Sequence, residues 1–68
     1  MPTAKDVVRF LKKRGFVEKR QSGSHLVLKS LKTGTRIIVP MHAKDLPKGL
    51  FVRILKDAGF SLEDWHSD

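Results

Sequence analysis

The spacing of apolar residues predicts a helix near the start of the chain. Between residues 4 and 14 they recur at intervals of three and four, as on one helical face: Val7, Phe10 and Leu11. Three basic residues fall away from this face: Arg9, Lys12 and Lys13. Thr3 can cap this helix and Gly15 suits the left-handed position that ends one. We therefore expect an amphipathic helix over residues 4–14 with a basic outer face.

Three segments with the pattern of strands follow, at residues 16–21, 24–31 and 35–39. The turn signals between them are Ser22-Gly23 and Lys32-Thr33-Gly34, and Pro40 ends the third strand. Alternation in the second strand places Leu26 and Leu28 on one face, and His25, Val27 and Lys29 on the other. Consecutive strands joined by short turns predict an antiparallel meander.

A second helix is predicted from Pro47, which suits a first helical position, to Ala58, before Gly59. Its apolar stripe consists of Leu50, Phe51, Ile54, Leu55 and Ala58. Ser61 can cap a last short turn, from which Trp65 would pack on the edge of the core. The two helices can bury their stripes only against one sheet face. The sequence thus predicts an α+β fold of order α-β-β-β-α, a single domain over residues 1–68.

Composition limits the functions open to this chain. A chain of 68 residues buries only about 60% of its unfolded surface, so we expect no internal ligand cavity. It has no cysteine, which excludes disulfides and Cys-based zinc sites. Its N-terminus lacks the apolar segment of a signal peptide, and no apolar run approaches the length of a membrane span. We expect a soluble cytoplasmic protein without a membrane partner.

The charge is strongly asymmetric along the chain. Fourteen Lys and Arg residues against seven Asp and Glu give a net charge of +7. Residues 1–36 carry ten basic and two acidic side chains, whereas residues 37–68 carry four basic and five acidic ones. A concentrated positive potential attracts polyanions, and RNA or DNA is the first partner to consider.

One polar turn in the basic half carries candidate chemistry. The segment RQSGSH at residues 20–25 places a histidine, His25, directly after a tight turn. Histidine is the side chain type that gains or loses a proton near neutral pH. Gly23 would let a phosphate approach the backbone, and the amides of residues 22–24 could form an anion-binding nest. Alone, a strand histidine is a poor catalytic signal.

A metal site is the rival chemistry. The residues that could supply it are His25, His42, His66 and Asp45. Their spacing matches no helical or loop ligand motif, and the basic half lacks the acidic pairs of two-metal nucleases. We therefore expect no metal and no other cofactor. His42 comes shortly after Val39-Pro40 and is expected to hold its loop through a hydrogen bond. His66 lies in an acidic tail and is expected to be solvated.

Four segments together resemble the HicA toxin family, over nearly the whole chain from residue 4 to about residue 65. They are Gly15-Phe16, RQSGSH at 20–25, VPMHAKDL at 39–46, and Gly49-Leu50 with RILKDAG at 53–59. The resemblance implies a fold like a double-stranded-RNA-binding domain, endoribonuclease activity on mRNA and a HicB-type antitoxin partner. It also implies that His25 is the catalytic residue. Because the second helix has only Lys48 in its first turn, binding of duplex RNA is not implied.

The expected reaction uses the 2′-hydroxyl of RNA as nucleophile and no metal. Histidine can take or give a proton, while nearby cations stabilise the phosphorane. The expected substrate-binding residues are Arg20, Gly23, Ser24, Lys29 and Arg36. Two other functions stay open: a non-catalytic RNA-binding module that uses the same basic surface, and a pure protein-interaction domain.

Overall fold

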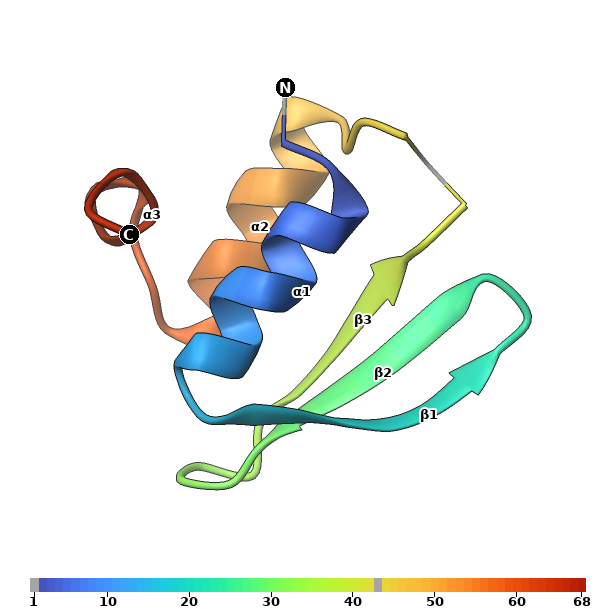
Figure 1. The fold of residues 1–68 in the computed structure, drawn as a ribbon. Coiled ribbons are helices and arrows are strands. Elements are labelled where there is room, and N and C mark those ends of the chain that lie inside the picture. Colours follow the sequence, from blue (N-terminus) through green and yellow to red (C-terminus); the bar gives the residue numbers. More distant parts are fainter. Residues whose placement is uncertain (1, 43) are drawn as a thin grey trace.

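The chain forms two helices over a three-stranded sheet, followed by a third short helix (Figure 1). The computed structural model describes residues 2–42 and 44–68; Met1 and Ala43, both within the predicted domain, lie outside the described residues. The elements are α1 (Ala4–Lys13), β1 (Phe16–Ser22), β2 (His25–Ser30), β3 (Arg36–Pro40), α2 (Lys48–Ala58) and α3 (Leu62–His66). The predicted α+β order is confirmed, with α3 in place of the expected last turn.

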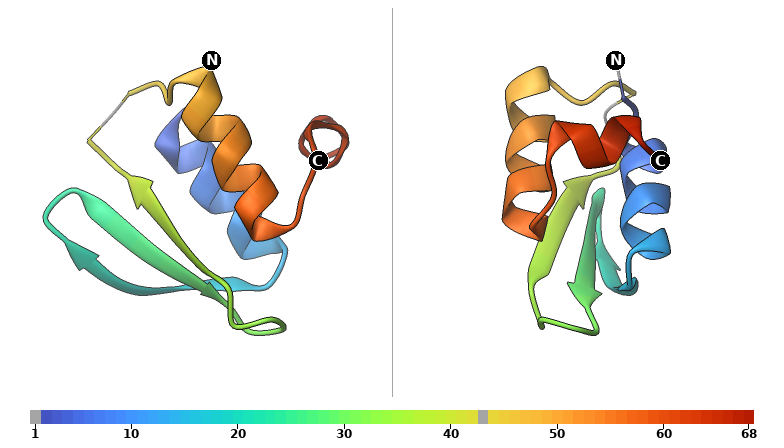
Figure 2. Two further views of the ribbon diagram at one scale, coloured as in Figure 1. Left: turned by 180° about the vertical axis from the view of Figure 1, so that it is seen from behind. Right: turned by 90° about the vertical axis from the view of Figure 1, so that its left-hand side faces the viewer.

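The sheet is an antiparallel meander in the order β1-β2-β3. Its inner face contributes five buried apolar residues to the core: Phe16, Leu26, Leu28, Ile37 and Val39. α1 and α2 pack side by side against this face, as the views in Figure 2 show. The predicted faces of β2 are confirmed, because Leu26 and Leu28 are buried while His25 is exposed. The outer face of the sheet is left without a covering layer of described residues.

Local hydrogen bonds explain where the elements begin and end. Thr3 and Asp6 form a reciprocal capping box at the start of α1. α1 ends at Lys13, one residue earlier than predicted, and Gly15 adopts a left-handed φ of 91°. β2 ends at Ser30, whose buried hydroxyl accepts hydrogen bonds from the backbone N–H groups of the following turn. Leu31, predicted to end this strand, is instead 73% exposed.

α2 begins after Pro47 rather than at it. Pro47 has a ψ of 142°, an extended conformation that excludes it from the helix and makes it the N-cap. The apolar stripe of α2 is buried through Phe51, Ile54 and Leu55. No helix in the described part of the chain has the length and apolar character needed to cross a membrane.

α3 closes one end of the core. Trp65 lies against Phe51 and Phe10, with ring centroids 4.8 and 5.1 Å apart, which confirms its predicted position on the core edge. The Arg14 guanidinium donates a hydrogen bond of 2.9 Å to Asp68, and this bond lowers the pKa of the Asp68 carboxyl below its ordinary value. The C-terminal segment is therefore tied to α1 by aromatic packing and by an ion pair.

Candidate functional site

A two-residue turn positions His25 at the beginning of β2. Ser22 pairs with His25 across the hairpin, so Gly23 and Ser24 are the turn residues. Gly23 has a φ of 59° and Ser24 a negative φ, the combination found in a type II′ turn. The Gln21 side-chain amide donates to the Gly23 carbonyl at 3.1 Å. This turn presents the exposed His25 side chain on the outer face of the sheet.

A β-bulge in β1 brings Arg20 onto the same face. Glu18 pairs with Leu28 and Arg20 pairs with Val27, so Lys19 is the extra residue. A bulge adds one residue to its strand and re-aims the side chains that follow it. Since Val27 shares the outer face with His25, Arg20 does so too. In a regular strand, Arg20 would have pointed to the inner face instead.

The bulge creates a basic hollow on the outer face. Its volume is about 370 Å³, and its lining residues are Lys19, Arg20, Val27 and Arg36. Lys29 lies beside it, because it pairs across the sheet with Arg36. We name Lys19, Arg20, Lys29 and Arg36 the sheet cations. The structure thus brings three expected substrate-binding residues to one region of one face.

The sheet cations differ electrostatically from the cations of α1. Among the ion pairs of residues 2–42 and 44–68, none involves a sheet cation. In α1, by contrast, Arg9 pairs with Asp6, Lys12 pairs with Glu18, and Lys13 lies 3.7 Å from Asp68. The predicted basic outer face of α1 is therefore partly neutralised. The positive charge available to a polyanion is greater on the sheet.

The cations lie at different distances from His25. Lys29 is four residues from His25 on β2, about 13 Å along a strand. Val27, the cross-strand partner of Arg20, is only two residues from His25. Of the expected substrate-binding cations, Arg20 is thus placed closest to His25 by the strand register. Lys29 and Arg36 lie farther along the same face.

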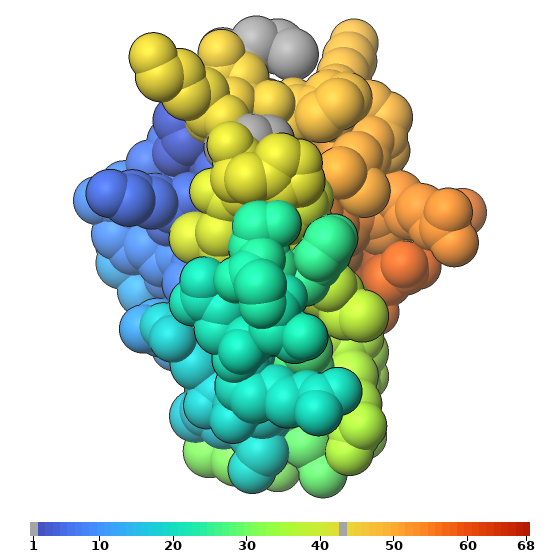
Figure 3. Space-filling view, turned by 90° about the vertical axis from the view of Figure 1, so that its right-hand side faces the viewer, coloured from blue at the N-terminus to red at the C-terminus, as the bar shows by residue number. Residues whose placement is uncertain are grey.

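The structure also places His42 beside His25. The centroids of the two imidazole rings are 6.2 Å apart, and the ring planes are inclined at 65°. His25 pairs with Pro40, two residues before His42, and the Met41 N–H donates to the Ser24 carbonyl at 2.6 Å. Figure 3 shows the hairpin tip (blue-green) against the loop after β3 (yellow). Sequence reasoning missed this pairing because it requires the register of β2 and β3.

Other candidate groups are not assembled in the same way. His66 lies in α3, and Asp45 forms a backbone β-bridge with Thr3. Within the described part of the chain, no group of three or more His, Cys, Asp or Glu residues could hold a metal ion.

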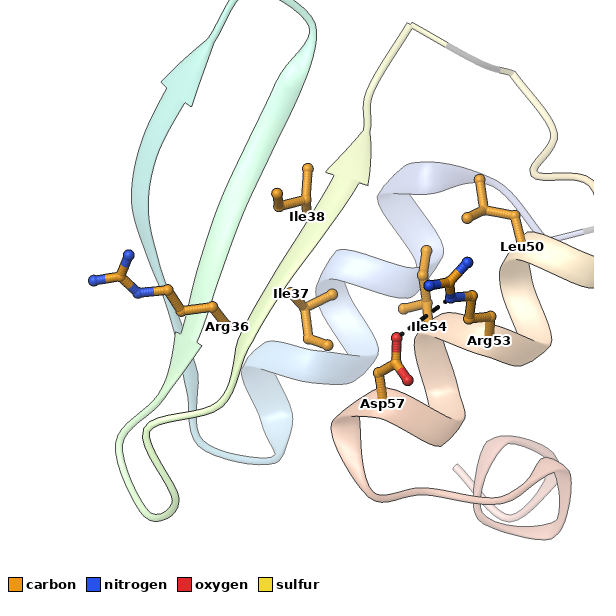
Figure 4. A pocket seen from close by; sticks show the side chains of 7 residues that line it. All are labelled: Arg36, Ile37, Ile38, Leu50, Arg53, Ile54 and Asp57. Carbon is orange, nitrogen blue, oxygen red and sulfur yellow. Dashed lines mark ion pairs between the residues drawn. The ribbon is translucent and has the colours of Figure 1, made fainter.

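A second hollow lies between β3 and α2 and differs from the basic one. Its wall is mainly apolar, with Ile37, Ile38, Leu50 and Ile54. Figure 4 shows Arg53 turned toward Asp57, with which it forms an ion pair of 3.8 Å, and Arg36 extended away from α2. Arg36 lines both this groove and the basic hollow on the outer face of the sheet.

The family relationship agrees with this architecture. Residues 4–60 match the family model described as the HicA toxin of bacterial toxin-antitoxin. The chain belongs to the HicA toxin family. The match spans α1, the whole sheet, the loop with His42, and α2, while α3 lies beyond it. Membership implies a cognate antitoxin as partner of this HicA toxin. Comparison with curated proteins gave no match.

Proposed function

We propose that this HicA toxin is an endoribonuclease that cleaves mRNA and uses His25 as a catalytic residue. The observation that carries the proposal is the position of His25, exposed on the same sheet face as four cations that have no carboxylate partner in the described part of the chain. A polyanionic strand attracted to this face would lie across the histidine. Membership in a toxin family supports an activity that harms the host when unopposed.

The reaction follows from the chemistry of RNA. The 2′-hydroxyl attacks the adjacent phosphorus once its proton is removed, and the 5′-oxygen leaves once it is protonated. An imidazole performs one of these proton transfers near neutral pH. The products carry a 2′,3′-cyclic phosphate and a 5′-hydroxyl, and no metal is required. Products with only 3′-hydroxyl and 5′-phosphate ends would contradict this route.

The expected substrate-binding residues divide into two groups by their distance from His25. Arg20, which the bulge turns to the outer face, stabilises negative charge on the reacting phosphate. Gly23 and Ser24 allow close approach of that phosphate at the turn. Lys29 and Arg36 bind phosphates of the RNA strand farther from His25, where they add affinity and keep the RNA in position.

We further propose that the partner of this toxin is an acidic antitoxin of the HicB type. The sheet cations attract a carboxylate-rich surface as readily as they attract RNA. A protein bound there neutralises the charge and covers His25 at once. We place the toxin and its mRNA substrate in the cytoplasm.

The proposal is tested with purified toxin and mRNA in the presence of EDTA. We expect wild-type toxin to cut, and His25→Ala to reduce cleavage at least 100-fold, the contribution typical of a general acid or base. Because His25 is exposed, the variant should keep its thermal stability and its RNA affinity. His66→Ala is the matched control, since it removes an exposed histidine from α3.

Two results would contradict the proposal. If the wild-type protein bound RNA but did not cut it, the toxin would be a non-catalytic RNA-binding module. If it did not bind RNA even at low salt, the basic face would serve a protein partner instead. Cleavage by His25→Ala at the wild-type rate would remove His25 from the mechanism.

A further inference from the structure

We propose that His42 is the second acid–base residue of this site and performs the proton transfer that His25 does not. The inference rests on the proposed ribonuclease function. RNA cleavage needs two proton transfers on opposite sides of one phosphorus, and a single imidazole cannot be both acceptor and donor in one step. Among the described residues, one further histidine ring is recorded beside His25, that of His42, and it comes from the loop after β3.

The geometry of the two rings fits this division of work. Their centroids lie 6.2 Å apart with planes inclined at 65°, so the rings are close without stacking. A proton donor or acceptor must come within about 2.6–3.2 Å of its oxygen. Two rings at this separation can each approach one oxygen of a phosphoryl group placed between them. Both side chains are exposed, so a substrate can enter.

The loop that carries His42 is held on both sides. Before it, the Met41 N–H donates to the Ser24 carbonyl, the residue preceding His25. After it, Leu46 is fully buried, and its N–H donates a hydrogen bond of 3.0 Å to the Pro2 carbonyl. The first of these bonds joins the His42 loop directly to the hairpin turn. The position of His42 relative to His25 is thus fixed by the fold rather than by chance contact of two side chains.

The surroundings of His42 are basic. Lys5 of α1 and Lys44 line the same hollow as His42, together with Thr3, Ala4 and Met41. Asp45 follows in the loop, and its backbone forms an isolated antiparallel β-bridge with Thr3. The hollow has a volume of about 300 Å³ and opens beside the histidine. Such a hollow suits the part of the RNA strand beyond the scissile phosphate, where Lys5 and Lys44 would bind the next phosphates.

The proton balance of the step is complete with two histidines. One neutral imidazole accepts the 2′-hydroxyl proton as the bond from O2′ to phosphorus forms. The other, as imidazolium, gives its proton to the 5′-oxygen as the bond from phosphorus to O5′ breaks. The pair ends with its protons exchanged, and water-borne proton transfer restores the starting state. No oxidant, metal or further reactant takes part.

The first test compares His42→Ala, His42→Gln and His25→Ala in cleavage of a defined RNA. We expect both His42 variants to lose 10²–10⁴-fold in kcat/KM, because glutamine hydrogen-bonds but does not transfer a proton. The wild-type pH profile should be bell-shaped and each single variant should lose one limb. Affinity for a 2′-O-methyl RNA, which cannot be cut, should stay within twofold of wild type. His66→Ala is again the control.

A second test separates the two roles. With a uridine 3′-aryl phosphate, the leaving group departs without needing a proton, so the general acid becomes dispensable. We expect one histidine variant, and not the other, to regain most of its activity on this substrate. This outcome identifies which residue is the acid and cannot arise from a merely structural role.

The two proposals fail in different ways. If wild type cuts and His25→Ala is inactive while both His42 variants cut within about threefold of wild type, the His42 proposal alone is overturned. A bell-shaped profile that persists in His42→Gln would also overturn it, as would recovery of both or neither variant on the aryl phosphate. If wild type itself does not cut RNA, the ribonuclease proposal fails with it.

Discussion

Gly23 sets the direction in which the chain enters β2 and therefore the position of His25. Its φ of 59° lies in the left-handed region, which costs an L-residue with a side chain roughly 1–2 kcal/mol. No atom lies within 4 Å of the place a Cβ would occupy, so the cost is conformational rather than steric. Gly23→Ala should lower the free energy of unfolding by about 1 kcal/mol in chemical denaturation.

Gly49 offers the matched control for this prediction. It also has open space around a Cβ, but it lies in α2 and has no positive φ. Gly49→Ala should leave the free energy of unfolding unchanged or raise it by up to about 1 kcal/mol, because alanine has less backbone entropy to lose. Equal effects at the two positions would show that the left-handed turn contributes nothing to stability.

The elements of the fold were predictable because each carries a local signal. These signals are the cap at Thr3, the left-handed glycines and the apolar stripes of the helices. Each lies within a few residues of the boundary or element that it predicts. The differences at Leu31 and Pro47 are of one residue each. The first comes from the hydrogen bonds that the Ser30 hydroxyl accepts in the folded turn, and the second comes from the extended ψ of Pro47. Element identity follows from local pattern, while the exact ends depend on the hydrogen bonds and the backbone conformation of the folded turns and loops.

The candidate site was only partly predictable, because it depends on register. The motif residues 20–25 were identifiable from sequence, but strict alternation would have separated Arg20 from His25. The bulge at Lys19 brings Arg20 and His25 to one face, and no residue type in the sequence predicts this bulge. The contact between His25 and His42 likewise requires the pairing of β2 with β3. Non-local pairing therefore decides the chemistry, even where local pattern decides the fold.

α3 lies outside the family match but contributes to stability through Trp65. This residue is partly buried and contacts two core rings, Phe10 and Phe51. Trp65→Ala should lower the free energy of unfolding by about 2–3 kcal/mol, somewhat below the range for a fully buried tryptophan. The measurement is urea unfolding followed by circular dichroism. Glu63→Ala, an exposed change in the same helix, should stay within about 0.5 kcal/mol; a similarly small effect of Trp65→Ala would mean that α3 does not stabilise the core.

At the scale of the whole molecule, ion pairing changes how the net charge is presented. The charge of +7 includes three α1 cations, Arg9, Lys12 and Lys13, which lie within ion-pair distance of Asp6, Glu18 and Asp68 respectively. It also includes the sheet cations, which form no ion pair among the described residues. A carboxylate close to a cation cancels much of the positive potential that the cation presents to a polyanion. The outer face of the sheet should therefore bind a polyanion in preference to α1, although both are rich in Lys and Arg.

This preference is measurable as a salt dependence. For single-stranded nucleic acid, each neutralised phosphate contributes about −0.7 to the slope of log affinity against log salt. Arg36→Ala, which removes a cation from the basic hollow, should reduce the magnitude of the slope by about 0.7 when a 2′-O-methyl RNA is titrated at several salt concentrations. Lys12→Ala changes the net charge equally but removes a cation paired with Glu18, so the slope should change far less. If the two variants changed the slope equally, RNA would respond to the net charge of the toxin and not to the face that carries His25.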